Sequence, residues 1–382
     1  MQDGFLRAAA ASIPVAVADP RRNAAAVCAR IDQAHRARAA LLVLPELCVT
    51  GYTCGDLFLS ALLLDAAEEA LLNICAHTQN CDPVVVLGVP LRAGGKLYNC
   101  AAVLHRGRIL GVVPKTHLPN YGEFYELRQF SSAKTLEGKA YTIPLCGQNV
   151  PFGTALLFCC SGMQDYTFGV ELCEDLWVPC PPSTRLCAGG AAIILNLSAS
   201  DEVIGKADYR RMLVSATSAR LACGYVYCSA SPTESTQDMV FSRHHLIAEN
   251  GTILAERRFA TGLTITEIDL QKLAHERQRM TTYPADAPDL YPNYFELECT
   301  ETRLTRPIAP NPFVPADHGD RAARCREILT LAALGLKKRL AHTRAKTAVV
   351  GLSGGLDSTL ALLITARAME LLGRPQSDIL AV

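Results

Sequence analysis

The sequence has no excess of charge of either sign, since 37 lysines and arginines balance 37 aspartates and glutamates over 382 residues. Without a net field the chain has little to attract nucleic acid or an anionic membrane, so we expect neither as a partner. No uninterrupted apolar run reaches the roughly 18 residues of a membrane helix. The apolar N-terminal run is broken by Pro14 and Asp19, which favours a first strand over a secretory signal.

The sixteen cysteines include no Cys-x-x-Cys pair, and we identify no Cys/His cluster with the spacing of a zinc site. Disulfide frameworks are typical of short secreted chains. This chain is long, and its cysteines lie in apolar runs such as LLFCCSG (156–162). We therefore expect most of them to be small buried hydrophobic residues in a reducing cytoplasm.

Short apolar runs alternate with amphipathic segments over the first 270 residues. Strands are predicted at the end of 37–47 and in 83–91, 98–115, 166–173, 191–200 and 225–230, and helices at 22–38, 58–78 and 207–222. Mixed strands with intervening helices are typical of an α/β layered fold. We therefore expect one α/β domain over residues 5–270.

The pattern changes after residue 270. Residues 271–320 are rich in proline and polar residues and predict a connector. Residues 321–382 predict a helix followed by one strand–loop–helix–strand unit. One and a half strands do not make a parallel sheet. We therefore expect this segment to be the truncated start of a larger α/β domain.

Three chemically reactive residues each end a strand-like run, namely Glu46, Lys115 and Cys173. Side chains at strand ends can converge at one rim of a layered α/β fold. There a thiol could attack an amide or nitrile carbon, a carboxylate could move its proton, and an ammonium could stabilise the oxyanion. Taken alone, each is more often a surface or packing residue. Neighbouring acids such as Glu174 would raise the pKa of the thiol, so a thiolate needs a cation nearby.

Three segments resemble the Glu, Lys and Cys motifs of the carbon–nitrogen hydrolase (nitrilase-like) superfamily, in the same order. They are LPELCVTGY (44–52), VVPKTHLPNYGEFYELRQF (112–130) and FGVELCEDLW (168–177). The resemblance covers the first domain and implies a nitrilase-like four-layer αββα sandwich. PNYGEFYE and NLSASDEVIGKADYRR (196–211) resemble, more narrowly, the glutaminase domain of glutamine-dependent NAD synthetases.

The resemblance implies roles for individual residues. Glu46 would be the general base, Lys115 would stabilise the oxyanion, and Cys173 would form the γ-glutamyl thioester. Glu123 would be a supporting acid that holds Lys115 and the substrate amide. A surface acid in a loop is the alternative for Glu123.

The same resemblance implies how glutamine is recognised. Tyr121, Ser200 and Lys206 would bind its α-amino and α-carboxylate groups, and Glu174 could meet the α-ammonium. Lys206 departs from the arginine more often expected there. A lysine offers a point charge where arginine offers a bidentate fork, so carboxylate binding would be looser.

A glycine-rich loop follows the predicted strand near residue 350. It consists of Ser353, Gly354, Gly355, Leu356, Asp357 and Ser358. Backbone N–H groups at the start of a helix suit phosphate, and no Gly-Lys-Ser/Thr follows, which excludes a Walker motif. The loop resembles the pyrophosphate loop of the ATP pyrophosphatase fold, which implies ATP with Mg²⁺, whose ligands stay unknown. A capped turn is the alternative.

Together the two resemblances imply a ligase that uses L-glutamine, ATP and deamido-NAD. Ammonia from glutamine would amidate the adenylated deamido-NAD. They also imply a cytoplasmic, octamer-like homo-oligomer. We expect this chain to be a fragment with at most glutaminase activity. The alternatives are a free carbon–nitrogen hydrolase (amidase), another glutamine-fed AMP-forming ligase, and a non-enzymatic scaffold in which Cys173 is inert.

Overall fold

The computed structural model describes residues 4–136, 139–284, 289–298, 300–315 and 317–382. The chain divides into two compact units, of which the first ends at Arg306 and the second begins at Pro307. The segment predicted as a connector contributes a helix, α5 (Leu270–Arg279), and a strand, β15 (Tyr291–Phe295), to the first unit. The N-terminal segment is a strand, as the sequence predicts.

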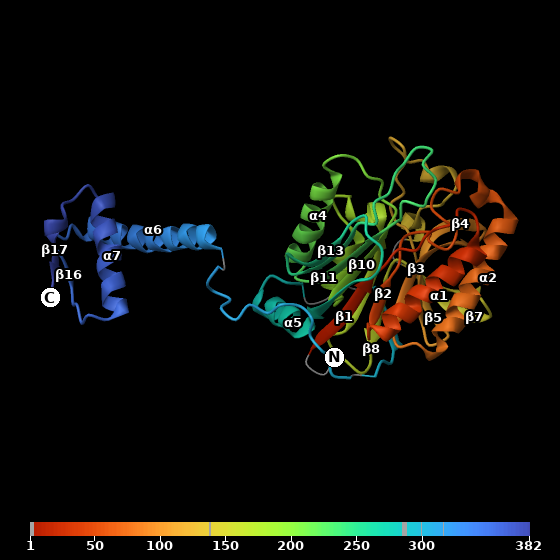
Figure 1. The fold of residues 1–382 in the computed structure, drawn as a ribbon, viewed down its shortest axis with the longest axis horizontal. Helices are drawn as coiled ribbons and strands as arrows, with labels where there is room; N and C mark the ends of the chain where they lie inside the picture. Colours follow the sequence, from red (N-terminus) through yellow and green to blue (C-terminus); the bar gives the residue numbers. More distant parts are fainter. Residues whose placement is uncertain (1–3, 137–138, 285–288, 299, 316) are drawn as a thin grey trace. The chain divides into compact units, whose positions relative to one another are not determined.

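In the described residues the first unit contains two mixed sheets (Figure 1). The larger sheet has the order β14-β1-β2-β3-β4-β5-β7-β6. Its strands are β1 (Phe5–Ala10), β2 (Leu41–Val43), β3 (Val84–Ala93), β4 (Lys96–His105), β5 (Arg108–Pro114), β6 (Ala140–Leu145), β7 (Gln148–Gly153) and β14 (Thr264–Asp269). Strands β1, β2 and β3 run parallel. Strand β2 lies between the other two, and the loop that carries Glu46 follows it.

The second sheet has the order β13-β12-β11-β10-β9-β8-β15. Its other strands are β8 (Leu156–Cys160), β9 (Thr167–Leu172), β10 (Ile193–Ser198), β11 (Gly224–Ser229), β12 (His245–Glu249) and β13 (Thr252–Arg257). Strands β9, β10 and β11 are parallel. Their carboxyl ends therefore meet at one edge, where Cys173 follows β9 and Ala199 follows β10.

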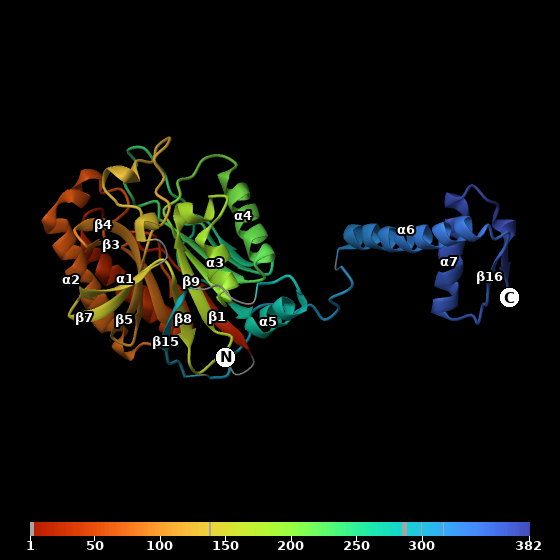
Figure 2. The same ribbon diagram turned by 180° about the vertical axis from the view of Figure 1, so that it is seen from behind.

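Helices cover the outer face of each sheet (Figures 1 and 2). Helices α1 (Pro20–Arg36) and α2 (Ala61–His77) lie on the first sheet, and α3 (Pro182–Ala188) and α4 (Lys206–Arg220) on the second. Helix α1 begins where Asp19 accepts the N–H of Arg22 and Pro20 takes the first helical position. Short 3₁₀ turns occupy Gly55–Leu59, Thr78–Asn80, Glu126–Arg128, Ala133–Leu136 and Cys173–Leu176.

The alternation of side chains along β3 shows how the layers are built. Val85 and Leu87 pack in one apolar cluster with α1 and α2, whereas Val84 and Val86 pack between the sheets with residues such as Phe158. A third cluster joins the second sheet to α3 and α4. A strand buried on both faces is apolar throughout, and this explains the VVVLGV run. The predicted four-layer αββα sandwich is confirmed.

The second unit contains α6 (His318–Thr343), β16 (Ala348–Val350), α7 (Leu356–Leu371), a 3₁₀ turn at Gln376–Asp378 and β17 (Ile379–Ala381). Strands β16 and β17 pair in parallel, with α7 as the crossover. This is the helix–strand–loop–helix–strand order that the sequence predicts. Across the described ranges of the whole chain, no helix combines the length and apolar character needed to cross a membrane.

Candidate active site

A buried acid and a buried ammonium form the centre of the site. Lys115 Nζ donates to Glu46 Oε1 at 2.6 Å, and neither side chain is exposed. Asn99 Nδ2 donates to the same oxygen at 2.7 Å, and the N–H of Ala199 donates to Glu46 Oε2 at 2.8 Å. Strands β4, β5 and β10 therefore hold the carboxylate of Glu46 in one orientation.

The loop that carries Glu46 is held close to β3. Leu47 has the left-handed φ of 50°, a conformation that costs a non-glycine residue about 1–3 kcal/mol. A Cβ on Gly88 of β3 would lie 2.1 Å from the Leu47 nitrogen and 2.6 Å from the Glu46 Cα. Only glycine at 88 allows this approach, because the atoms it would meet are backbone.

A second acid contacts Lys115, but it is Glu126. Lys115 Nζ lies 2.7 Å from Glu126 Oε1, and Tyr52 donates its hydroxyl hydrogen to the same oxygen at 2.8 Å. Glu123, which the sequence analysis chose for this contact, is half-buried and lines a cavity that Glu126 and Tyr52 also border. The choice of Glu123 as the acid that holds Lys115 was wrong, because the loop turns Glu126 inward.

Cys173 lies at a strained turn between β9 and the following 3₁₀ helix. Its φ is 40°, and its side chain is buried. Asp175 fixes this turn, since its carboxylate accepts the N–H of Leu172 at 3.1 Å and that of His117 at 2.8 Å. Asp175 therefore joins the turn that carries Cys173 to the segment that follows Lys115.

The electrostatics of the site keep the thiol protonated at rest. Burial raises the pKa of Cys173 far above its ordinary value, and the carboxylates of Glu46 and Glu126 raise it further, against the opposing effects of Lys115 and the Ala199 N–H. Burial acts to lower the pKa of Lys115, but the charges of Glu126 and Glu46 outweigh it and raise that pKa well above normal. The cation that the sequence analysis required near Cys173 is thus present and charged.

The residues predicted to recognise glutamine gather beside Cys173. The Tyr121 hydroxyl donates to Glu174 Oε1 at 2.8 Å. Lys206 Nζ lies over the rings of Phe124 (5.6 Å) and Trp177 (5.7 Å) and forms an ion pair with Asp201. Burial raises the pKa of Glu174. Aromatic rings beside an acid and an ammonium could hold a zwitterionic amino acid.

Ser200 is also buried, and its partner is a residue that the sequence analysis missed. Arg210, from α4, is fully buried and donates from Nη2 to Ser200 Oγ and to the Asp201 carbonyl oxygen, both at 3.1 Å. Its Nη1 contacts Glu202 Oε2 at 3.1 Å and His244 Nδ1 at 2.9 Å. Arg210 lies within the segment 196–211 quoted above. Helical periodicity alone does not show that Arg210 is buried and that its neighbour Arg211 is exposed.

The predicted phosphate loop of the second unit is a tight turn at the start of α7. Residues 353–357 are exposed, and Gly354 has a φ of 81°. The hydroxyls of Ser358 and Thr359 donate to the Gly355 carbonyl oxygen at 3.1 and 2.9 Å. These contacts cap the start of α7, where the first backbone N–H groups of a helix have no partner within the helix.

An αββα sandwich with a buried acid, ammonium and thiol at its strand ends defines a nitrilase-like domain. The chain belongs to the carbon–nitrogen hydrolase family, which residues 7–278 match. Residues 328–380 match the NAD synthase family. The chain is 41% identical over 392 aligned positions to the glutamine-dependent NAD(+) synthetase of Mycobacterium tuberculosis, covering 100% of this chain and 57% of that protein. It is 25% identical over 366 positions to the synthetase of Aquifex aeolicus, covering 95% and 58%.

Solved structures give the same result. The glutamine-dependent NAD(+) synthetase of Cytophaga hutchinsonii has a TM-score of 0.59 and 26% identity, covering 96% of this chain and 52% of that one. An amidase from Nesterenkonia sp. has a TM-score of 0.55 and 19% identity over 73% of this chain and 96% of that one, and supports the fold alone. The predicted resemblance to glutamine-dependent NAD synthetases is confirmed, and the chain spans little more than half the length of these synthetases.

Proposed function

We propose that the first unit is a glutaminase, in which Cys173 releases ammonia from L-glutamine to feed NAD synthesis. The observation that carries this proposal is the buried Lys115, whose ammonium contacts both Glu46 and Glu126 beside the Cys173 thiol. A buried ion pair of this kind is costly to maintain, and perturbed thiol, acid and ammonium groups together favour covalent amide hydrolysis.

The reaction proceeds through a thioester. Cys173 Sγ attacks the side-chain amide carbon of glutamine while Glu46 takes the thiol proton, and Lys115 stabilises the oxyanion. Glu46 then gives the proton to the amide nitrogen, the C–N bond breaks, and ammonia leaves. Water, deprotonated by Glu46, attacks the thioester carbon, and glutamate leaves as Cys173 regains its proton. Because the resting thiol is protonated, Glu46 must accept the proton of Cys173 at the same time as Sγ attacks the amide carbon.

Substrate recognition is assigned to four residues. Tyr121 and Glu174 meet the α-ammonium, and Ser200 and Lys206 bind the α-carboxylate. The ion pair of Lys206 with Asp201 means that the ammonium of Lys206 is shared between Asp201 and the substrate. Glu123, which lines a cavity together with Glu126 and Tyr52, is assigned an auxiliary contact with the substrate.

For the complete enzyme we propose an ATP-dependent ligase that amidates adenylated deamido-NAD with this ammonia. Ser353, Gly354, Gly355, Leu356, Asp357 and Ser358 would hold the ATP phosphates. Mg²⁺ would neutralise the phosphate charges, and we assign it no ligands. The match to the NAD synthase family supports this reading, as does the exposure of the turn at the start of α7. The enzyme is proposed to be a cytoplasmic homo-oligomer whose glutaminase activity lies in the first unit.

The test is ammonia release from L-glutamine by the chain and by Cys173→Ala, with Cys180→Ala as the matched control because Cys180 is an exposed thiol. We expect release that Cys173→Ala lowers at least about 10⁴-fold and that Cys180→Ala leaves unchanged. Equal turnover of aliphatic amides would favour the free amidase instead. If the chain is silent, it is assayed joined to a complete synthetase domain with ATP and deamido-NAD. Silence there, or activity independent of Cys173, contradicts the proposal.

A further inference from the structure

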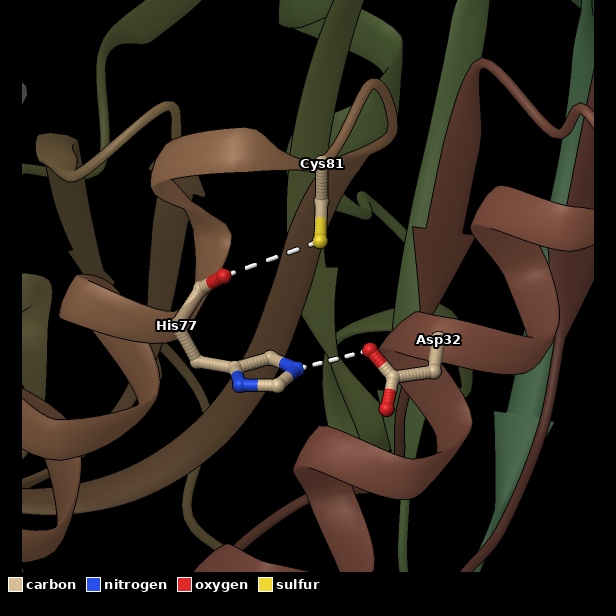
Figure 3. Close-up of side chains that lie close together, drawn as sticks. All are labelled: Asp32, His77 and Cys81. Atoms are coloured by element: carbon tan, nitrogen blue, oxygen red, sulfur yellow. Dashed lines mark hydrogen bonds and ion pairs between the residues drawn. The ribbon is translucent and has the colours of Figure 1, made fainter.

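Three side chains with metal-binding atoms meet where α1 packs on the end of α2. Asp32 lies on α1, His77 is the last residue of α2, and Cys81 follows the 3₁₀ turn Thr78–Asn80 (Figure 3). Their ligand atoms all lie within 4.8 Å of one another, and His77 Nε2 lies 2.8 Å from Asp32 Oδ1. Cys81 is buried, whereas the side chains of Asp32 and His77 are partly exposed. The cluster is therefore open to an ion on one side and closed on the other.

A second thiol lies near this cluster. Cys28 precedes Asp32 by one helical turn on α1, and residues four apart in a helix are neighbours. Its sulfur is not among the ligand atoms that meet, so Cys28 is counted as a neighbour of the cluster and not as a ligand. One thiol, one imidazole and one carboxylate thus converge where α1 packs on the end of α2.

We propose that Asp32, His77 and Cys81 bind a single divalent ion of the zinc class. Zn²⁺ is bound tetrahedrally by sulfur, imidazole nitrogen and carboxylate oxygen at about 2.0–2.3 Å, and three protein ligands leave one position for water. A thiolate and an imidazole favour it over Mg²⁺ and Ca²⁺, which prefer oxygen ligands. The ion would replace the direct contact between His77 and Asp32 with one ligand bond to each.

The charges around the cluster favour a cation. The carboxylates of Asp32 and of Asp82, the residue that follows Cys81, place negative charge at the cluster. Asp82 itself contacts His35 (3.2 Å) and Arg106 (3.9 Å), so it is not counted as a ligand. A divalent ion would displace the thiol proton of Cys81 and fasten α1 to the end of α2.

No Cys/His cluster is recognisable in the sequence at this site, because the donors come from two segments and His77 and Asp32 are 45 positions apart. Only the packing of α1 on the end of α2 brings Asp32 beside His77 and Cys81.

The test is titration of the metal-free chain with Co²⁺, followed by displacement with Zn²⁺. We expect one ion per chain and a thiolate-to-cobalt charge-transfer absorption. We expect Cys81→Ser, His77→Ala and Asp32→Asn each to weaken binding about tenfold or more, and Cys81→Ser to remove the thiolate absorption. His35→Ala, which removes a histidine paired with a carboxylate at the same helix surface, is the matched control and should bind as the wild type does.

Two further variants test whether the ion binds at the proposed residues. Cys173→Ser must bind Co²⁺ normally, because an ion lost in this variant belongs to the catalytic thiol. Asp32→Asn lies on a half-exposed surface and should fold even where Cys81→Ser does not. The absence of stoichiometric binding, an absorption without a thiolate band, or binding that survives Asp32→Asn and His77→Ala overturns the proposal. Zn²⁺ should raise the melting temperature of the wild type and of His35→Ala, but not that of His77→Ala.

Discussion

The ammonium of Lys115 donates a 2.6 Å hydrogen bond to the carboxylate of Glu46 in a place where neither side chain reaches solvent. Removing one partner of such a buried pair costs about 3–5 kcal/mol, because it leaves an uncompensated charge. Asn99 and the Ala199 N–H complete the set of donors around Glu46. The arrangement orients a base and an oxyanion donor before substrate arrives, which is the condition for electrostatic preorganisation.

Replacing Glu46 with glutamine should separate chemistry from folding. Glutamine keeps an oxygen to accept from Lys115 and Asn99 but cannot take a proton, so ammonia release should fall about 10²–10⁴-fold. Asp65→Asn is the control, since Asp65 contacts Arg92 on the surface and should retain full activity. The measurement is ammonia release with circular dichroism on the same samples. Wild-type activity in a folded Glu46→Gln variant would remove Glu46 from its role as the base.

The same substitution, glutamate to glutamine, distinguishes the roles of Glu126 and Glu123. At pH 8, where the carboxylate of Glu126 is mostly ionised, Glu126→Gln removes the second negative charge that contacts Lys115, so we expect kcat to fall about 10–10³-fold. Glu123→Gln changes only the lining of the cavity and should leave kcat within about threefold and alter KM alone. Steady-state kinetics with L-glutamine measures both. The reverse ranking would restore the original choice of Glu123.

The pH dependence of stability should carry the signature of Glu126. Burial raises its pKa to about 7 from an ordinary 4.5, so the folded state holds a proton that the unfolded state releases. This stabilisation is complete below pH 4.5 and is lost as the pH rises through 7. We therefore expect the free energy of unfolding of the wild type, minus that of Glu126→Gln, to increase as the pH falls from 8 towards 5. Urea unfolding of both proteins measures this difference. A difference that is independent of pH, or that grows with rising pH, would contradict the assignment.

The sequence predicted the layers because burial leaves a direct signature in it. Strands such as β3 are apolar on both faces, and the outer helices show helical periodicity, so the pattern predicts an α/β layered fold, whereas the four-layer αββα order was implied by the resemblance to the carbon–nitrogen hydrolase superfamily. Strand β15 was missed because its residues are polar and rich in tyrosine and proline, and its place in the sheet is given only by its pairing with β8. Such pairing depends on tertiary contacts that a local pattern does not contain.

The site was predictable where a residue follows closely on a strand and was not where it lies farther along a loop. Lys115 and Cys173 directly follow β5 and β9, and Glu46 comes three residues after β2, so the strands bring the three together. Glu126 and Glu123 share one loop, and no spacing rule says which of the two points inward. Arg210 was overlooked because charged residues are rarely fully buried, and only the packing of α4 shows that it is.

Gly88 allows the Glu46 loop to approach β3, and its substitution tests that contact. A Cβ in Gly88→Ala would lie 2.1 Å from the Leu47 nitrogen, so the backbone must shift. We expect a loss of about 1–3 kcal/mol together with a fall in ammonia release, because Glu46 moves with the loop. Gly335→Ala is the control, since nothing lies within 4 Å of its added methyl and alanine favours the helix. Unchanged stability and activity in Gly88→Ala would show that the loop approaches less closely than described.

Arg210 is the positioning residue that we expect to set glutamine affinity. Its fork contacts Ser200, Glu202 and His244 at once, and a lysine cannot replace these contacts. In Arg210→Lys, Ser200 loses its donor, so KM for glutamine should rise about tenfold or more while kcat changes little, with a stability loss of about 1–3 kcal/mol. Arg211→Lys is the neighbouring control, because Arg211 is exposed and forms an ion pair with the partly exposed Glu256. If Arg210→Lys lowers stability but leaves KM unchanged, Arg210 supports the fold and has no part in recognising the substrate.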